Sequence, residues 1–303
     1  MKSLKIALDW TPNINHIGFY VAKELGFYTE EGIELELLNP KDDNYTQTPG
    51  KKLELDLADF AIAPFETVIS LNNKANKVNA VAIFAILQED LSSIVSLKSA
   101  NILSPKDLDG KIYASYQARY EDHIVKQMIK NDQGTGNLTI SYPEKLGIWN
   151  TLLEGKADAT WIFDNWEGIE ATDKNIELNK FSLKNYGIPY GYSPVIIAKQ
   201  EKLTTEKIAY KAFIKATQKG YLHAIKNPNV AISILKNHLT AADKENIDLQ
   251  KCIEFTAPYF GTEKTCGTMK NTRVTAFINW LVENNLEDEK ILNQALFTNE
   301  LFG

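Results

Sequence analysis

A short segment near the N-terminus, residues 9–16, carries side chains suited to binding a flat, polar ring. It follows an apolar run that predicts a buried strand. Trp10 offers a face for stacking, and Asn13, Asn15 and His16 offer hydrogen-bond donors and acceptors without a fixed charge. Open α/β sheets place their ligands where strands end in loops that lead into helices. The segment therefore suits a neutral heterocycle better than a phosphate or a sugar acid.

Each of these side chains also has a structural interpretation. Trp10 can cap a core instead of a ligand, and His16 can cap the helix that begins near Gly18. Asparagine readily hydrogen-bonds its own backbone, so one of Asn13 and Asn15 is expected to form a turn. Both interpretations stay open at this point.

Glu66 is a candidate of a different kind, because it carries a charge. It follows a strand-like run, residues 60–63, at the start of a helix-like segment. A carboxylate in the first turn of a helix is favoured by the helix dipole. It can equally accept a hydrogen bond from the exocyclic amine of an aminopyrimidine.

A second aromatic set accompanies the strand-like run at residues 160–163. Trp161 and Trp166 are two indoles within six residues, which is unusual for packing alone, and with Asp164 they form the predicted ligand-binding set of this region. Asp164 and Asn165 each also fit the N-cap of the following helix. Three tyrosines complete the predicted site: Tyr116, Tyr190 and Tyr192. Packing is the alternative role of Tyr190 and Tyr192.

Alternating strands and helices must position these residues, which indicates largely parallel sheets. After about residue 204 the pattern is helical, and Trp149 and Trp280 lie in helical patterns typical of a core. Strands are predicted at residues 4–8, 33–38, 60–63, 78–87, 94–97, 112–115, 138–142, 160–163 and 195–198. Helices are predicted at residues 19–31, 66–75, 121–131, 148–154 and 205–226.

The pattern fits two α/β lobes and a helical C-terminal part. The chain is expected to leave the first lobe near residues 88–93 and to return near residues 190–193, where apolar strands are interrupted by polar or aromatic residues. Lobe one then comprises residues 1–90 and 192–303, and lobe two comprises residues 91–191. A ligand held between such lobes is bound by their closure.

Composition and charge exclude several classes of protein. The 303 residues suffice for two domains, and 44% hydrophobic with 24% charged residues is ordinary for a globular chain. A net charge of −6 makes nucleic acid a poor partner. The only arginines are Arg119 and Arg273. This scarcity disfavours an anionic ligand, because arginine is the side chain best suited to bidentate hydrogen bonding with carboxylate, sulfonate or phosphate.

Cysteine, metal and targeting signals are few. Cys252 and Cys266 are the only cysteines, and they can form one disulfide or remain two thiols. No His/Cys cluster has the spacing of metal ligands, and no cofactor is predicted. No apolar stretch reaches the roughly 18 residues of a membrane span, so no membrane insertion is expected. No signal peptide is recognisable, so the protein is periplasmic or at the cell surface if an export signal was trimmed, and cytoplasmic otherwise.

Several segments resemble the NMT1/THI5-like family. The most specific are residues 8–22 (LDWTPNINHIGFYVA) and residues 159–170 (ATWIFDNWEGIE); the turn at residues 104–111 is shared by many binding proteins. Further similar segments are residues 26–37, 59–66, 193–198 and 297–301.

This resemblance implies a bilobed type II periplasmic-binding-protein fold of class α/β, with two parallel or mixed sheets flanked by helices. It implies a solute-binding protein, not an enzyme, that binds a thiamine-precursor aminopyrimidine between its lobes for uptake or salvage. An ABC-transporter permease is the implied partner.

Three alternatives share this fold. The family's pyrimidine synthases use a loop lysine that forms a Schiff base with pyridoxal phosphate, a loop histidine and a cysteine-rich run, but the matching loop, residues 61–67, has neither lysine nor histidine, and the run is missing. A thiaminase-like enzyme needs a nucleophilic cysteine, whereas Cys252 and Cys266 fall in the late helical part. A nitrate- or sulfonate-type receptor is disfavoured by the neutral, aromatic site.

Overall fold

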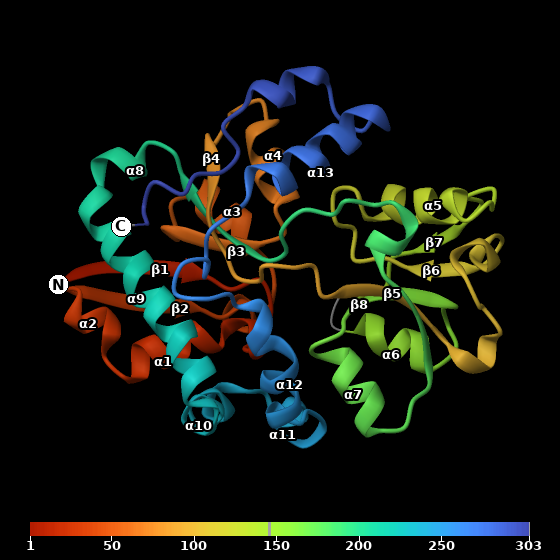
Figure 1. The fold of residues 1–303 in the computed structure, drawn as a ribbon, viewed down its shortest axis with the longest axis horizontal. Coiled ribbons are helices and arrows are strands. Elements are labelled where there is room, and N and C mark those ends of the chain that lie inside the picture. Colours follow the sequence, from red (N-terminus) through yellow and green to blue (C-terminus); the bar gives the residue numbers. More distant parts are fainter. Residues whose placement is uncertain (145–146, 303) are drawn as a thin grey trace. The chain divides into compact units, whose positions relative to one another are not determined.

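The computed structural model describes residues 1–144 and 147–302, which group into two compact units (Figure 1). Unit one takes the described residues of Met1–Asp90, Gly191–Val274 and Asn293–Gly303. Unit two takes those of Leu91–Tyr190 and Thr275–Leu292. Each unit is built around its own sheet.

Five strands form the sheet of unit one: β1 (Lys2–Ala7), β2 (Ile33–Leu38), β3 (Phe60–Ala63), β4 (Ala80–Ala85) and β10 (Val195–Lys199). Their order is β2-β1-β3-β10-β4. β1 pairs in parallel with β2 and β3, and β10 runs antiparallel between β3 and β4. All residues of β3 and β4 are buried, as expected of apolar strands covered on both faces.

The helices of unit one are α1 (Ile17–Glu24), α2 (Phe27–Glu30), α3 (Pro49–Glu54), α4 (Glu66–Asn72), α8 (Lys202–Thr205), α9 (Lys207–Lys226), α10 (Pro228–His238), α11 (Ala241–Asn246) and α12 (Leu249–Thr256). α1 and α9 lie side by side (Figure 1). Gly220 permits this approach, because a Cβ there would collide with the carbonyl oxygen of Gly18. The next residue, Tyr221, donates a hydrogen bond of 2.5 Å to the Asn15 carbonyl, so α9 also holds the loop in front of α1.

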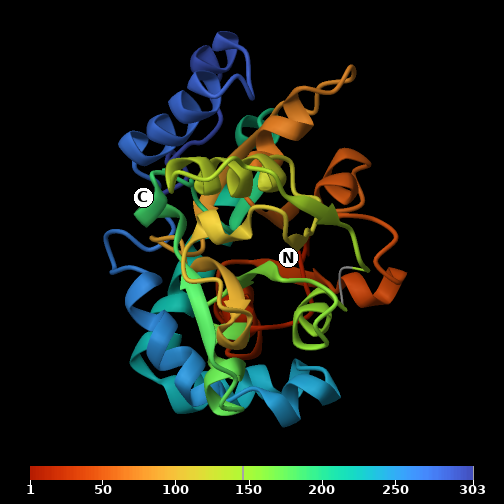
Figure 2. The same ribbon diagram turned by 90° about the vertical axis from the view of Figure 1, so that its right-hand side faces the viewer.

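Unit two contains β5 (Ser92–Leu97), β6 (Ile112–Ala114), β7 (Thr139–Ser141), β8 (Ala159–Phe163) and β9 (Leu178–Phe181), with α5 (Glu121–Asn131), α6 (Ile148–Leu153) and α7 (Glu167–Asp173). The strand order is β7-β6-β8-β5-β9. β6 runs parallel to β7 and β8, and β5 runs antiparallel to β8 and β9. Figures 1 and 2 show α5 on one side of this sheet and α6 and α7 on the other.

The remaining helical segments are short, apart from α13 (Asn271–Glu283), whose first residues group with unit one and whose later residues group with unit two. The 3-10 helices among the described residues are η1 (Ile14–His16), η2 (Pro40–Asp43), η3 (Lys98–Ala100), η4 (Pro105–Leu108), η6 (Leu183–Tyr186), η7 (Ala257–Tyr259) and η8 (Glu289–Asn293).

Two mixed sheets flanked by helices confirm the predicted α/β class. The helix predicted over residues 19–31 is broken into α1 and α2 at Gly26, whose φ of 76° is a left-handed conformation that ends a helix. β9 was not predicted, because its sequence, Leu-Asn-Lys-Phe, lacks the alternation of a half-buried strand. No helix within the described ranges is long and apolar enough to cross a membrane.

Candidate functional site

The structure brings six of the predicted site residues to one edge of the unit-one sheet. β1 and β3 run parallel, with Ala7 opposite Ala61, so the segments that follow both strands leave at the same edge. β10 is antiparallel and starts at this edge, with Val195 opposite Ala63. The residues gathered in this way are Trp10, Asn13, Asn15, His16, Glu66 and Tyr192.

A buried imidazole orients a carboxylate at this edge. His16 is fully buried, and its Nε2 lies 2.8 Å from Asp9 Oδ1. Its Nδ1 accepts a hydrogen bond of 3.3 Å from the Asn13 backbone N–H, so the proton of the neutral ring is on Nε2 and is donated to Asp9. The Asp9 side chain is 27% exposed. Asp9, which was not among the site residues predicted from the sequence, therefore presents a fixed carboxylate to solvent.

Asn13 is the turn former among the two asparagines. It is the N-cap of η1, where its Oδ1 accepts from the Asn15 N–H at 2.9 Å and its Nδ2 donates to the Thr11 carbonyl at 3.2 Å. His16 completes the capping box of η1, but in the N-cap position of α1 its side chain makes no capping hydrogen bond, so the structure does not support the helix-cap interpretation of that histidine. Direct ligand contacts by Asn13, Asn15 and His16 stay predictions.

Trp10 has an aromatic neighbour that the sequence did not reveal. Its ring and that of Tyr45 are half-buried, with centroids 6.4 Å apart and planes at 58°. Asn44 and Tyr45 both adopt left-handed backbone conformations, with φ of 53° and 58°, which is unfavourable for residues other than glycine. Burial raises the pKa of the Tyr45 phenol, with the charge of Asp243 adding to the shift, so the phenol stays a hydrogen-bond donor.

Glu66 and Tyr192 lie deeper than Trp10. Glu66 is 3% exposed, in the first turn of α4, and the backbone N–H of Phe65 donates to the Tyr192 carbonyl at 3.0 Å. The Tyr192 hydroxyl accepts from the Lys270 N–H at 2.9 Å, and the Arg273 guanidinium lies 4.8 Å from the ring centroid. These contacts favour the packing role of Tyr192, while ligand binding by Glu66 stays a prediction.

In unit two the structure brings two of the predicted aromatic residues, Trp161 and Tyr190, into contact. The rings of Trp161 and Tyr190 meet edge to face with centroids 5.4 Å apart, and Tyr190 makes a similar contact with Phe277. Trp161 and Trp166 are buried, 9% and 8% exposed. This arrangement matches either a wall for a ring or an aromatic core.

Asp164 has a structural role other than the helix cap considered for it. α7 begins at Glu167 with Trp166 in the N-cap position, so the N-cap interpretation of Asp164 and Asn165 is wrong. The Asp164 carboxylate instead accepts from Ser93 Oγ at 2.6 Å and pairs with Lys180 at 2.7 Å. Both of its oxygens are thereby engaged, and ligand binding by Asp164 stays a prediction.

Tyr116 lies in the loop that follows β6, at the carboxyl edge of the unit-two sheet. Its backbone N–H donates to Glu121 Oε1 at 3.0 Å. Burial raises the pKa of its phenol well above the ordinary value, and the charges of Glu167 and Glu121 add to the shift. The surroundings of Tyr116 are therefore anionic.

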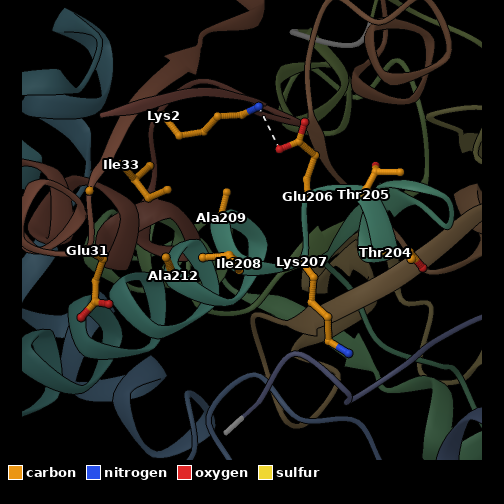
Figure 3. A pocket seen from close by; sticks show the side chains of 11 residues that line it. Lys2, Glu31, Ile33, Thr204, Thr205, Glu206, Lys207, Ile208, Ala209 and Ala212 are labelled. Atoms are coloured by element: carbon orange, nitrogen blue, oxygen red, sulfur yellow. Dashed lines mark ion pairs between the residues drawn. The ribbon is translucent and has the colours of Figure 1, made fainter.

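A groove of about 540 Å³ in unit one lies elsewhere (Figure 3). It is lined by Lys2 at the amino end of β1 and by residues around the start of α9, and Lys2 pairs with Glu206 across it at 2.9 Å. None of the predicted site residues lines it, because they follow the opposite end of β1.

Cysteine and metal chemistry find little support in the described residues. Cys266 is a buried free thiol, so it is not bonded to Cys252. Burial raises the pKa of Cys266 to about 12, which leaves almost no thiolate at neutral pH. In the part of the chain that the structure describes, no group of three or more His, Cys, Asp or Glu side chains is placed to hold a metal ion.

The sequence model of one protein family, described as NMT1/THI5 like, matches residues 13–231, well over half of the chain. The chain belongs to this family. Among its relatives, a formylaminopyrimidine-binding protein of Halalkalibacterium halodurans is 24% identical over 258 residues, 84% of this chain and 75% of the relative. A 4-amino-5-hydroxymethyl-2-methylpyrimidine phosphate synthase of Legionella pneumophila is 25% identical over 245 residues, 78% of this chain and 74% of the relative.

The fold of this NMT1/THI5-like chain is that of the periplasmic binding proteins. The alkanesulfonate-binding protein SsuA from Xanthomonas axonopodis pv. citri, solved bound to MOPS, superposes with a TM-score of 0.72 at 11% identity and 98% coverage of each chain. At such low sequence identity the superposition shows a shared fold but does not identify the ligand. The predicted fold is therefore confirmed, and the ligand is not determined by this comparison.

Proposed function

We propose that this chain is a solute-binding protein for a neutral thiamine-type aminopyrimidine, such as the hydroxymethyl or formylaminomethyl compound. The observation that carries the proposal is the Asp9 carboxylate, which is hydrogen-bonded to the fully buried His16, is 27% exposed and directly precedes Trp10 in the chain. An aminopyrimidine has a flat ring that stacks on an indole and an exocyclic amine that donates to a carboxylate.

Two further observations support this ligand class. Unit one carries Arg273, but its guanidinium donates to the carbonyls of Gln88 and Gly191 and to the Glu89 carboxylate, so it is engaged within the protein. The relative named a formylaminopyrimidine-binding protein matches this chain over most of its length. In this role the chain passes its ligand to an ABC-transporter permease, on the periplasmic or outer side of a membrane.

A pyrimidine synthase is the second candidate, because one relative carries that name. The segment after β3 reads Pro64-Phe65-Glu66 and offers no amine for a Schiff base to pyridoxal phosphate. The Cys266 thiol, with its raised pKa, likewise makes a poor nucleophile for a thiaminase-like reaction.

Calorimetry tests the proposal directly. We expect 4-amino-5-hydroxymethyl-2-methylpyrimidine to bind more tightly than taurine or nitrate, and at 100 times its Kd to stabilise the fold by about 2.7 kcal/mol. Tight taurine binding without a pyrimidine signal would overturn the assignment. If borohydride traps pyridoxal phosphate stoichiometrically on one lysine, the chain is a pyrimidine synthase instead.

A further inference from the structure

The loop between β6 and α5 has the backbone shape of an anion site. Gln117 adopts a left-handed conformation, with φ of 60°, between residues whose N–H groups turn inward. Successive N–H groups around such a residue form a concavity that binds anions. It lies directly before the N-terminus of α5, where the helix dipole also favours negative charge.

That concavity is already occupied by a carboxylate of the protein. Glu121 is 3% exposed; its Oε1 accepts from the Tyr116 N–H at 3.0 Å and from the Tyr113 hydroxyl at 2.8 Å. Its Oε2 accepts from the Ala118 N–H at 3.1 Å. The intervening N–H, that of Gln117, donates to Ser115 Oγ at 3.0 Å. Three consecutive backbone donors are thus used inside the protein.

The neighbouring arginine is engaged in the same way. Arg119 is the only arginine of unit two, and its Nη2 and Nε donate to Glu287 Oε1 at 2.6 and 3.1 Å. The Tyr120 hydroxyl donates to the same oxygen at 2.5 Å, and the Glu287 side chain is only 8% exposed. Both groups that would attract a phosphate or sulfonate are therefore committed to internal carboxylates.

We propose that Glu121 is a resident anion that makes this edge of unit two reject ligands carrying a phosphate or sulfonate and accept uncharged ones. The inference rests on the proposed function, because it assigns the charge of the same aminopyrimidine ligand. Glu167 adds to the negative field around Tyr116, so an anionic group there meets repulsion as well as a lack of donors.

The decisive probes are 4-amino-5-hydroxymethyl-2-methylpyrimidine and its phosphate monoester, which share a ring and differ in charge. For the unaltered protein, calorimetry is expected to give at least tenfold tighter binding of the alcohol; a smaller ratio overturns the inference. If neither compound binds, the proposed function fails. If both bind equally well, only the resident-anion assignment fails.

A pair of variants distinguishes two effects of Glu121: its occupation of the backbone N–H donors and its contribution to the overall negative charge. Glu121→Gln keeps the shape and removes the charge, and it should reduce the preference for the alcohol at least fivefold while changing the alcohol's Kd less than threefold. Asp122→Asn removes one charge from the same helical turn but leaves Glu121 on the amides, and it should change the preference less than twofold. An unchanged preference in folded Glu121→Gln, or an equal change in Asp122→Asn, overturns the assignment.

Discussion

Unit one and unit two each place a carboxylate at the carboxyl edge of a sheet, and they use it in opposite ways. Asp9 receives its hydrogen bond from one side chain, His16, and remains 27% exposed. Glu121 receives two hydrogen bonds from backbone amides and one from a tyrosine, and it is 3% exposed. A carboxylate held by one buried donor is left available to a ligand, whereas one enclosed by the chain itself takes the place of a ligand.

The tryptophans show the same contrast and give the largest expected effect. Trp161 is 9% exposed and packs on Tyr190, whereas Trp10 is half-buried. Trp161→Ala should reduce the free energy of unfolding by about 3–5 kcal/mol, because it leaves a cavity. Denaturant titration measures this loss. If Trp161→Ala loses no more free energy of unfolding than Trp10→Ala does, the two tryptophans do not differ in their structural role.

Trp10→Ala should act on binding instead. Losing one stacking face and its buried area is expected to weaken aminopyrimidine binding by about 2–3 kcal/mol with little change in Tm. Calorimetry on the folded variant measures this effect. Trp280→Ala is the matched control, since Trp280 is buried against Phe277 and its loss should lower Tm without changing the Kd. Normal binding by Trp10→Ala would remove the indole from the site.

Glu66→Gln tests whether a deeply placed carboxylate of unit one also serves the ligand. The variant keeps the shape and removes the charge-assisted acceptor, so affinity should fall by about 1.5–3 kcal/mol. Glu34→Gln, on the exposed side of β2, removes the same charge and should leave the Kd unchanged. If the two variants bind the aminopyrimidine equally well, Glu66 has only a structural role at the start of α4.

The smallest effect concerns pH. Burial outweighs the three hydrogen bonds and raises the pKa of Glu121 above its ordinary value of 4.5. Folding therefore favours the protonated form at low pH. This stability is present in full below the unfolded pKa and is lost as pH rises through the folded pKa, above which Glu121 is the anion that the assignment requires. Relative to Glu121→Gln, the unaltered protein should lose Tm as the pH rises above the ordinary pKa of 4.5. A constant or opposite difference would contradict the raised pKa.

Elements with strong hydrophobic patterns could be predicted from the sequence, and tertiary hydrogen bonds could not. β2 and β3 were predicted with the bounds that the structure has, because β2 alternates apolar and charged residues and β3 is a short apolar run. Asp9 and Tyr45 were missed, because their roles depend on His16 and on two left-handed residues that leave no pattern in the sequence. The domain boundaries and the ligand contacts stay predictions.

The contrast between presented and enclosed carboxylates is tested most directly by calorimetry of two variants with 4-amino-5-hydroxymethyl-2-methylpyrimidine. Asp9→Asn should weaken binding by about 1.5–3 kcal/mol, because an acceptor to the ligand loses its charge. Glu121→Gln should change the Kd less than threefold, because Glu121 contacts only the protein. Wild-type affinity in Asp9→Asn, or an equal loss in Glu121→Gln, would contradict the account.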